Sequence, residues 1–133
     1  MTQPTAAGLA EVPLLSALPQ EMLETLATRF EEEEHAPGHP IVTEGRPGYA
    51  FYVVRSGSLS VTQDGRLLRT LGAGDFFGEI SILGEGVRTA TVTADTAAEV
   101  WVLFGTSFRV LQSQRPDVAA ALESAMDERL APE

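Results

Sequence analysis

The stretch from residue 76 to residue 94 holds the side chains in this chain that are best suited to chemistry. A Gly78-Glu79 pair opens what reads as one helical turn, a glycine-rich loop follows, and Arg88 then leads into a strand of Thr and Val. Backbone amides at a helix N-terminus point outward without partners, so they can bind phosphate oxygens, and a glycine lets a ligand come close. These residue types predict a site for a small phosphorylated ligand.

The charge distribution makes Arg88 the candidate cation of this site. The chain has 133 residues and a formal net charge of -10, all nine basic residues are Arg, and only Arg88 is cationic between Arg69 and Arg109. The overall field repels an anion, so an anion site must rely on a local cation and oriented amides. The competing interpretation is an ordinary surface ion pair between Arg88 and a neighbouring carboxylate.

The same stretch resembles the phosphate-binding cassette of the cyclic nucleotide-binding domain family. That family includes the catabolite activator protein, protein kinase A regulatory subunits and cyclic-nucleotide-gated channels. The resemblance rests on the run from Gly78 to Leu83, followed after four residues by Arg88-Thr89-Ala90-Thr91-Val92. Further matches extend it over about residues 14–116: Glu44-Gly45, Tyr52, Gly57, Leu71, Gly74-Asp75 and Phe77.

The resemblance implies a role for each residue of the site. Arg88 would form a charge-assisted pair with the cyclic phosphate of cAMP or cGMP, and Glu79 would accept a hydrogen bond from the ribose 2′-hydroxyl. Thr89 stands where members that favour guanine often carry a hydroxyl, but some adenine binders have one too, so the choice of nucleotide stays open. Val87 replaces the usual Pro, which removes a restraint on the loop. Main-chain amides near four residues would complete the cradle: Gly78, Ile80, Ser81 and Ala90.

Length and composition predict one domain over residues 12–130, behind a flexible tail of residues 1–11. A hydrophobic content of 44% with 21% charged residues is typical of a soluble globular protein, and 133 residues suffice for a single core. No apolar run reaches the roughly 20 residues of a membrane span, and the N-terminus lacks a secretory pattern. With no Cys, the chain fits a cytoplasmic protein. Its acidity argues against a nucleic-acid surface.

The apolar pattern predicts a mainly β fold: a jelly-roll-like antiparallel β-roll flanked by N-terminal and C-terminal helices. Helical spacing runs from residue 12 to residue 30, then from a cap at Thr106 or Ser107, and again from Pro116 to Leu130. The run Glu31 to Glu34 is interpreted as a solvated edge leading into a strand. Asp64-Gly65 predicts a type I′ hairpin. Strands are expected at 41–43, 50–55, 58–63, 66–71, 89–94 and 99–104.

Three classes of function follow. The first is a regulatory or sensor domain that binds a cyclic nucleotide and signals through the helices from Thr106 to Leu130. The second is a relative of the same fold that binds no nucleotide and acts as a protein interaction module; the joint presence of Gly78, Glu79 and Arg88 argues against it. For the first class, a C-terminal helix that covers the base would use Leu122, Met126 or Leu130.

The third class is a cupin-like enzyme, whose related barrel needs metal ligands. His35 and His39 are the only histidines, and they lie four residues apart around a turn, which does not supply a ligand set. No nucleophile–base pair is visible either, so we expect no enzymatic activity, no metal and no cofactor beyond the nucleotide ligand. The partner would be an effector protein or an attached domain, and a homodimer stays open.

Overall fold

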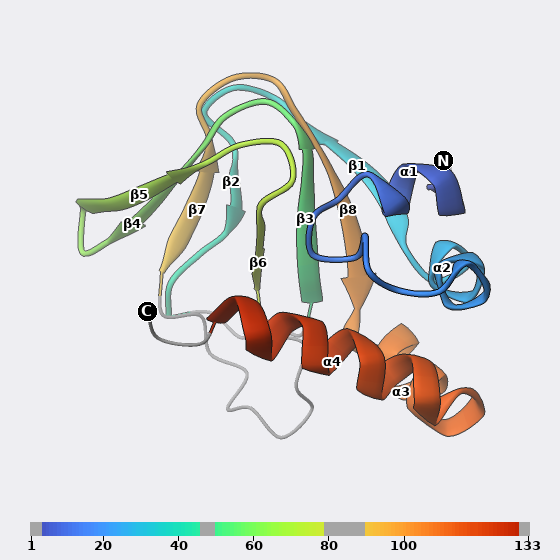
Figure 1. The fold of residues 1–133 in the computed structure, drawn as a ribbon. Coiled ribbons are helices and arrows are strands. Elements are labelled where there is room, and N and C mark those ends of the chain that lie inside the picture. The colour runs from blue at the N-terminus through green and yellow to red at the C-terminus, as the bar shows by residue number, and fades with distance from the viewer. Residues whose placement is uncertain (1–3, 46–49, 79–89, 131–133) are drawn as a thin grey trace.

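The computed structural model describes residues 4–45, 50–78 and 90–130, the last four of these as backbone only, and it consists of two four-stranded antiparallel sheets with helices against one of them (Figure 1). This confirms the predicted β-roll with flanking helices. Sheet A has the order β1 (Glu31–His35), β8 (Ala98–Phe104), β3 (Ala50–Ser56) and β6 (Phe76–Gly78). Sheet B has the order β2 (Pro40–Val42), β7 (Thr91–Ala94), β4 (Leu59–Gln63) and β5 (Arg66–Leu71).

Four helices form a layer on the outer side of sheet A. They are α1 (Ala6–Ala10), α2 (Gln20–Ala27), α3 (Gly105–Gln114) and α4 (Pro116–Leu130). Figure 1 shows α1 and α2 beside β1 and β8, and α4 crossing below the strand ends. Among the described residues, no helix is both long and apolar enough to cross a membrane.

Two apolar clusters share the central strands of sheet A. On β3, Phe51 and Val53 enter the cluster under the helices, whereas Tyr52 and Val54 enter the cluster between the sheets. The same alternation places Trp101 and Leu103 of β8 under the helices, with Val100 and Val102 between the sheets. Both strands are therefore buried on both faces, which is why their sequences are almost continuously apolar.

The N-terminal segment differs from its prediction. Residues 6–10, which the sequence placed in a flexible tail, form α1, where Thr5 Oγ1 accepts from the Gly8 amide at 3.0 Å and Leu9 is fully buried. The predicted tail is therefore wrong for α1. The helix expected from residue 12 is confirmed only over α2.

Helix α3 also begins differently from its prediction. Its N-cap is Phe104, which makes no side-chain cap bond, so neither Thr106 nor Ser107 is the cap. Phe108 and Leu111 are buried in the helical cluster, and their packing holds the helix without that bond. The predicted restart at Pro116 is confirmed, with Asp117 in the first turn of α4.

Two edge strands of sheet A, β1 and β6, were missed in the sequence. β1 consists almost entirely of Glu, and its pairing with β8 places Glu32 opposite Trp101, whose Nε1 donates to a Glu32 carboxylate oxygen at 3.4 Å. Trp101 is buried, and the Arg55 guanidinium lies 4.8 Å from its ring centre. The other missed strand, β6, has only three residues and pairs with β3.

The β4–β5 hairpin matches its prediction. Asp64 and Gly65 have φ values of 53° and 79°, as a type I′ turn requires. β5 is an edge strand with Leu67 and Leu68 exposed, and its register with β4 shifts between Val61 and Thr62. Charged residues and a bulge are common protections of a free edge, and Arg66 and Arg69 flank the two Leu side chains.

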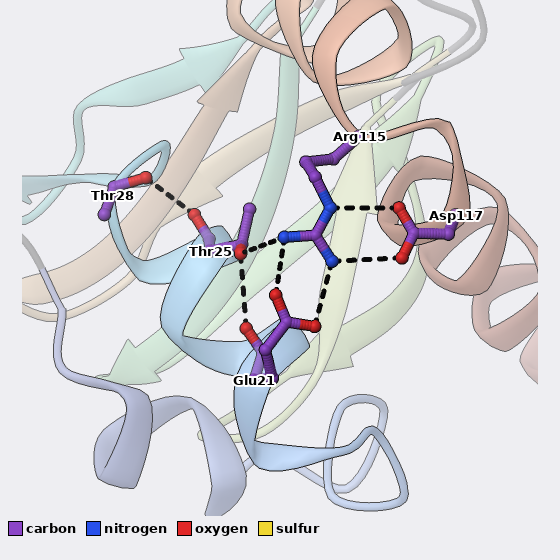
Figure 2. A network of polar contacts seen from close by, with 5 residues as sticks. All are labelled: Glu21, Thr25, Thr28, Arg115 and Asp117. Atoms are coloured by element: carbon purple, nitrogen blue, oxygen red, sulfur yellow. Dashed lines mark hydrogen bonds and ion pairs between the residues drawn. The ribbon is translucent and has the colours of Figure 1, made fainter.

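Arg115 joins the N-terminal and C-terminal helices (Figure 2). From the junction of α3 and α4, its guanidinium donates to both carboxylate oxygens of Glu21 in α2, and also to Thr25 at 3.2 Å. It donates further to the Asp117 carboxylate, at 3.1 and 3.0 Å. A planar fork with five N–H donors suits such a double pairing. Nearby, Arg29, which lies two residues beyond α2, donates to the side chain of Gln114 at the end of α3 at 2.8 Å.

Stability should depend on pH through this arrangement. Hydrogen bonds from Arg115 lower the pKa of Glu21 below its ordinary 4.5 and the pKa of Asp117 below its ordinary 3.8. Ionised forms are thus favoured in the folded state, so their contribution is present above these ordinary values and is lost as the pH falls through the folded pKa. We expect Arg115→Gln to lower the urea midpoint of unfolding at neutral pH. The difference between the midpoints of the variant and the wild type should shrink as the pH falls from about 5 toward about 2.

The matched control is Arg109→Gln, which removes the same charge from an exposed position on α3. It should shift the midpoint little at any pH. Since the side chains are a third to two thirds exposed, we also expect the Arg115 effect to shrink in salt. An Arg115→Gln difference that stays constant as the pH falls would assign the effect to lost packing.

Candidate functional site

The structure describes the two ends of the predicted ligand site. Gly78 is the last residue of β6 in sheet A, and Ala90 directly precedes β7 in sheet B. The other predicted site residues, Glu79, Ile80, Ser81, Arg88 and Thr89, lie outside the described residues. The helical turn expected at Gly78-Glu79 falls there too, apart from Gly78 itself, which is in a strand. The site segment therefore starts on one sheet and ends on the other.

Aromatic packing fixes the first end. β6 pairs with β3 so that Gly78 lies opposite Phe51 and Phe77 opposite Tyr52. The rings of Tyr52 and Phe77 stack with centroids 4.7 Å apart and planes 6° apart. Phe76 packs against Phe51 at 5.6 Å on the other face of the sheet. The strand is thus held from both faces up to Gly78, whose exposed backbone has a φ of 102°.

The carboxylate of Asp75 holds the turn before β6. Asp75 Oδ2 accepts from the Gly72 amide at 2.8 Å, and the Asp75 carbonyl accepts from the Val54 amide at 2.8 Å. The Gly74 amide in turn donates to the Val54 carbonyl at 2.9 Å. Asp75 therefore serves the turn that leads into β6.

Pairing on both sides fixes the second end. β7 lies between β2 and β4, and Thr91 pairs with Thr62 while Val92 pairs with both Val42 and Val61. The Thr91 hydroxyl also accepts from the Glu44 amide at 3.0 Å. In the sequence, Glu44 is singled out only as a position that matches the family. The contact between Glu44 and Thr91 was missed because these residues lie 47 positions apart in the chain.

Two of the three α4 side chains that were considered for covering a nucleotide base are buried in the structure. Leu122 is fully buried and Met126 is 5% exposed, both in the cluster under the helices that also holds Phe51 and Leu103. In this arrangement the apolar face of α4 is used for packing, so neither side chain is free to cover a ligand. The Leu130 side chain lies outside the described part.

A separate cavity of about 690 Å³ lies at the opposite end of sheet A from Gly78. Ser56, which lines it, is five residues from Phe51 along β3, or roughly 16 Å. The His35 ring contacts Glu33 at 3.0 Å and stacks on His39 at 5.1 Å. Within residues 4–45, 50–78 and 90–126, no three His, Cys, Asp or Glu side chains come together to hold a metal. The cavity therefore gives the cupin interpretation no support.

Two antiparallel four-stranded sheets with a helical layer on one of them define the β-roll class of domain. The chain belongs to the cyclic nucleotide-binding domain family, whose sequence model matches residues 32–115. This match includes the whole segment from Gly78 to Ala90 and confirms the resemblance seen in the sequence.

Three relatives illustrate the likeness. The chain is 41% identical over 105 residues to the cAMP-dependent protein kinase regulatory subunit of Yarrowia lipolytica, covering 77% of this chain and 28% of that protein. It is 36% identical over 107 residues to the cGMP-dependent protein kinase egl-4 of Caenorhabditis elegans, covering 75% and 14%. The chain therefore spans less than a third of either kinase-related protein.

The third relative is a solved structure, the N-terminal domain of a transcriptional regulator from Streptomyces coelicolor A3(2). It is 34% identical, with a TM-score of 0.78, and the match covers 92% of this chain and 91% of that one. The fold is thus shared over nearly the full length of both chains.

We expect Gly78→Ala to destabilise the fold at the entrance to the site. A φ of 102° is one that residues with a Cβ rarely adopt, so the substitution should lower the free energy of unfolding by ~1–3 kcal/mol in urea denaturation. Gly72→Ala is the control, because Gly72 has no positive φ and a Cβ added there would meet open space. Equal losses for both variants would mean that the Gly78 backbone relaxes without strain.

Proposed function

We propose that this domain binds cAMP or cGMP between the ends of β6 and β7 and acts as a regulatory module. The observation that carries the proposal is the family match over residues 32–115, which includes every residue of the segment from Gly78 to Ala90. The fold supports it, because each end of this segment is anchored in a different sheet. The proposed domain covers residues 12–130, and α1 extends it at the N-terminus.

The proposed roles follow the chemistry of a cyclic phosphate. Arg88 pairs with the phosphate, because a guanidinium presents its donors in a plane to two oxygens at once. Glu79 accepts from the ribose 2′-hydroxyl, since an ionised carboxylate has only acceptors to offer. Amides of Ile80, Ser81 and Ala90 complete the cradle, and Gly78 allows close approach. Thr89 is the candidate for reading the base.

The proposal extends to the setting of the domain. In this proposal, the domain has no catalytic activity of its own and takes no metal or cofactor other than the nucleotide. It works in the cytoplasm on an effector protein or an attached domain. Since the matches cover only 28% and 14% of the two kinase-related proteins, an effector in the same polypeptide is compatible with the proposal. A homodimer is compatible with these roles as well.

Replacement of Arg88 is the direct test. Arg88→Ala should abolish measurable binding of cAMP and cGMP in titration calorimetry, because losing one partner of a desolvated charge pair lowers affinity by roughly a few hundred- to several thousand-fold. Circular dichroism should show an intact fold. Arg109→Ala, with the same loss of charge on the exposed face of α3, should bind as wild type does.

Two outcomes would contradict the proposal in different ways. Near-wild-type affinity in a folded Arg88→Ala variant would remove Arg88 from the site. A wild-type domain that binds neither nucleotide would favour the second candidate, a relative of the same fold that serves as an interaction module.

We further propose that the signal leaves through the C-terminal helices, from Thr106 to Leu130. Strands of a sheet cannot move far without breaking their ladder, whereas α3 and α4 are held by side-chain packing against sheet A and by Arg115. Nucleotide should therefore change amide hydrogen exchange in α3 and α4 but not in the β4–β5 hairpin, which serves as the internal control. Changes confined to residues 78–90 would make the helices passive cover.

A further inference from the structure

Glu44 joins three segments that are distant in the sequence. It lies just beyond β2, and its amide donates to the Thr91 hydroxyl at 3.0 Å. That hydroxyl donates back to Glu44 Oε1 at 3.3 Å, so main chain and side chain of Glu44 hold the same Thr91 atom. Both Glu44 carboxylate oxygens also accept from the Asp64 amide, at 3.2 and 3.1 Å. The end of β2, the β4–β5 turn and the start of β7 thus meet at one carboxylate.

The residue types fit this task closely. Asp64 has the positive φ of the hairpin turn, and the hydrogen bond from its amide to a charged carboxylate is stronger than one to a neutral acceptor. A carboxylate offers only acceptors, so it can take the Asp64 amide and the Thr91 hydroxyl together. Glu44→Gln would place an N–H group where one oxygen now accepts, and two donors would then face each other about 3.1 Å apart.

Thr91 connects this junction to the proposed ligand site. It is the first residue of β7 and directly follows Arg88-Thr89-Ala90, so Arg88 lies within three Cα–Cα steps, or about 11 Å, of it. Binding groups must keep their position to within roughly 0.5 Å for full affinity. We infer that Glu44 is a positioning residue for nucleotide binding: it fixes Thr91, and hence the phosphate-binding end of the site. This inference rests on the proposed function.

If Glu44 fixes the site, Glu44→Gln should weaken nucleotide binding, whereas the change in charge alone predicts stronger binding. Glu44→Gln removes one negative charge from an acidic chain, which by itself should strengthen the binding of an anion. A purely structural role predicts a lower melting temperature with an unchanged dissociation constant while the protein is folded. Weaker binding by the folded variant is therefore specific to positioning.

The experiment is a titration of cAMP and of cGMP into wild type and variants, at a temperature where circular dichroism shows each protein to be folded. Glu44→Gln should weaken binding about tenfold, as expected for hydrogen bonds to a charged group, and by the same factor for both nucleotides because they share the phosphate. Thr91→Val should weaken binding similarly. Thr91→Ser keeps the hydroxyl and should bind as the wild type does. The double variant Glu44→Gln/Thr91→Val should lose less than the product of the single losses.

Two controls match these changes. Glu34→Gln removes the same charge from an exposed position on β1, in the other sheet, and should bind as well as wild type or slightly better. Thr93→Val makes the same change two residues further along β7, where the hydroxyl has no hydrogen bond within the described part of the chain, and should have no effect.

Unchanged or tighter binding by folded Glu44→Gln would overturn the inference and leave the proposed function standing. Wild type that binds neither nucleotide would overturn both. Should Glu44→Gln fail to fold, the comparison of Thr91→Val with Thr91→Ser decides: equal affinities would overturn the inference, and a loss only in the Val variant would support it. A Glu44→Gln loss for one nucleotide alone would also overturn it, because that result assigns Glu44 to the base.

Discussion

The pairing of β3 with β8 in the middle of sheet A is the interaction on which the rest of the structure depends. Each strand sends alternate side chains into two different apolar clusters, so a shift of one residue would exchange both sets at once. Register is therefore set by two cores rather than one. β1 then adds to the free side of β8, β6 adds to the free side of β3, and the helices cover the outer face.

This arrangement decides where the proposed ligand site can lie. Gly78 takes its position from Phe51 through the β3–β6 ladder, whereas Ala90 takes its position from Thr91 in sheet B. The distance between these ends is consequently set by the cluster between the sheets, in which Phe77 stacks on Tyr52 and packs with residues of both sheets. Packing between the sheets therefore fixes the span between Gly78 and Ala90.

Strong local signals predicted most of the fold. The positive φ values of Asp64-Gly65 and the start of α4 at Pro116 are encoded within a few residues, as are the apolar runs of β3 and β8. β1 could not be predicted in this way, since four Glu residues form a strand only because β8 lies beside them. Likewise, the Glu44 contacts depend on three segments meeting in space. Of the site, the sequence and the family match supply the proposed residue roles, and the structure adds the anchoring of Gly78 and Ala90.

The two clusters meet sheet A from opposite faces and have no residue in common, although they alternate along the same strands. Substitutions under the helices can therefore accumulate while the cluster between the sheets stays intact. Over evolutionary time, such a division lets the packing of the helical layer change without rebuilding the cluster between the sheets. A single shared core would have tied these two properties to the same mutations.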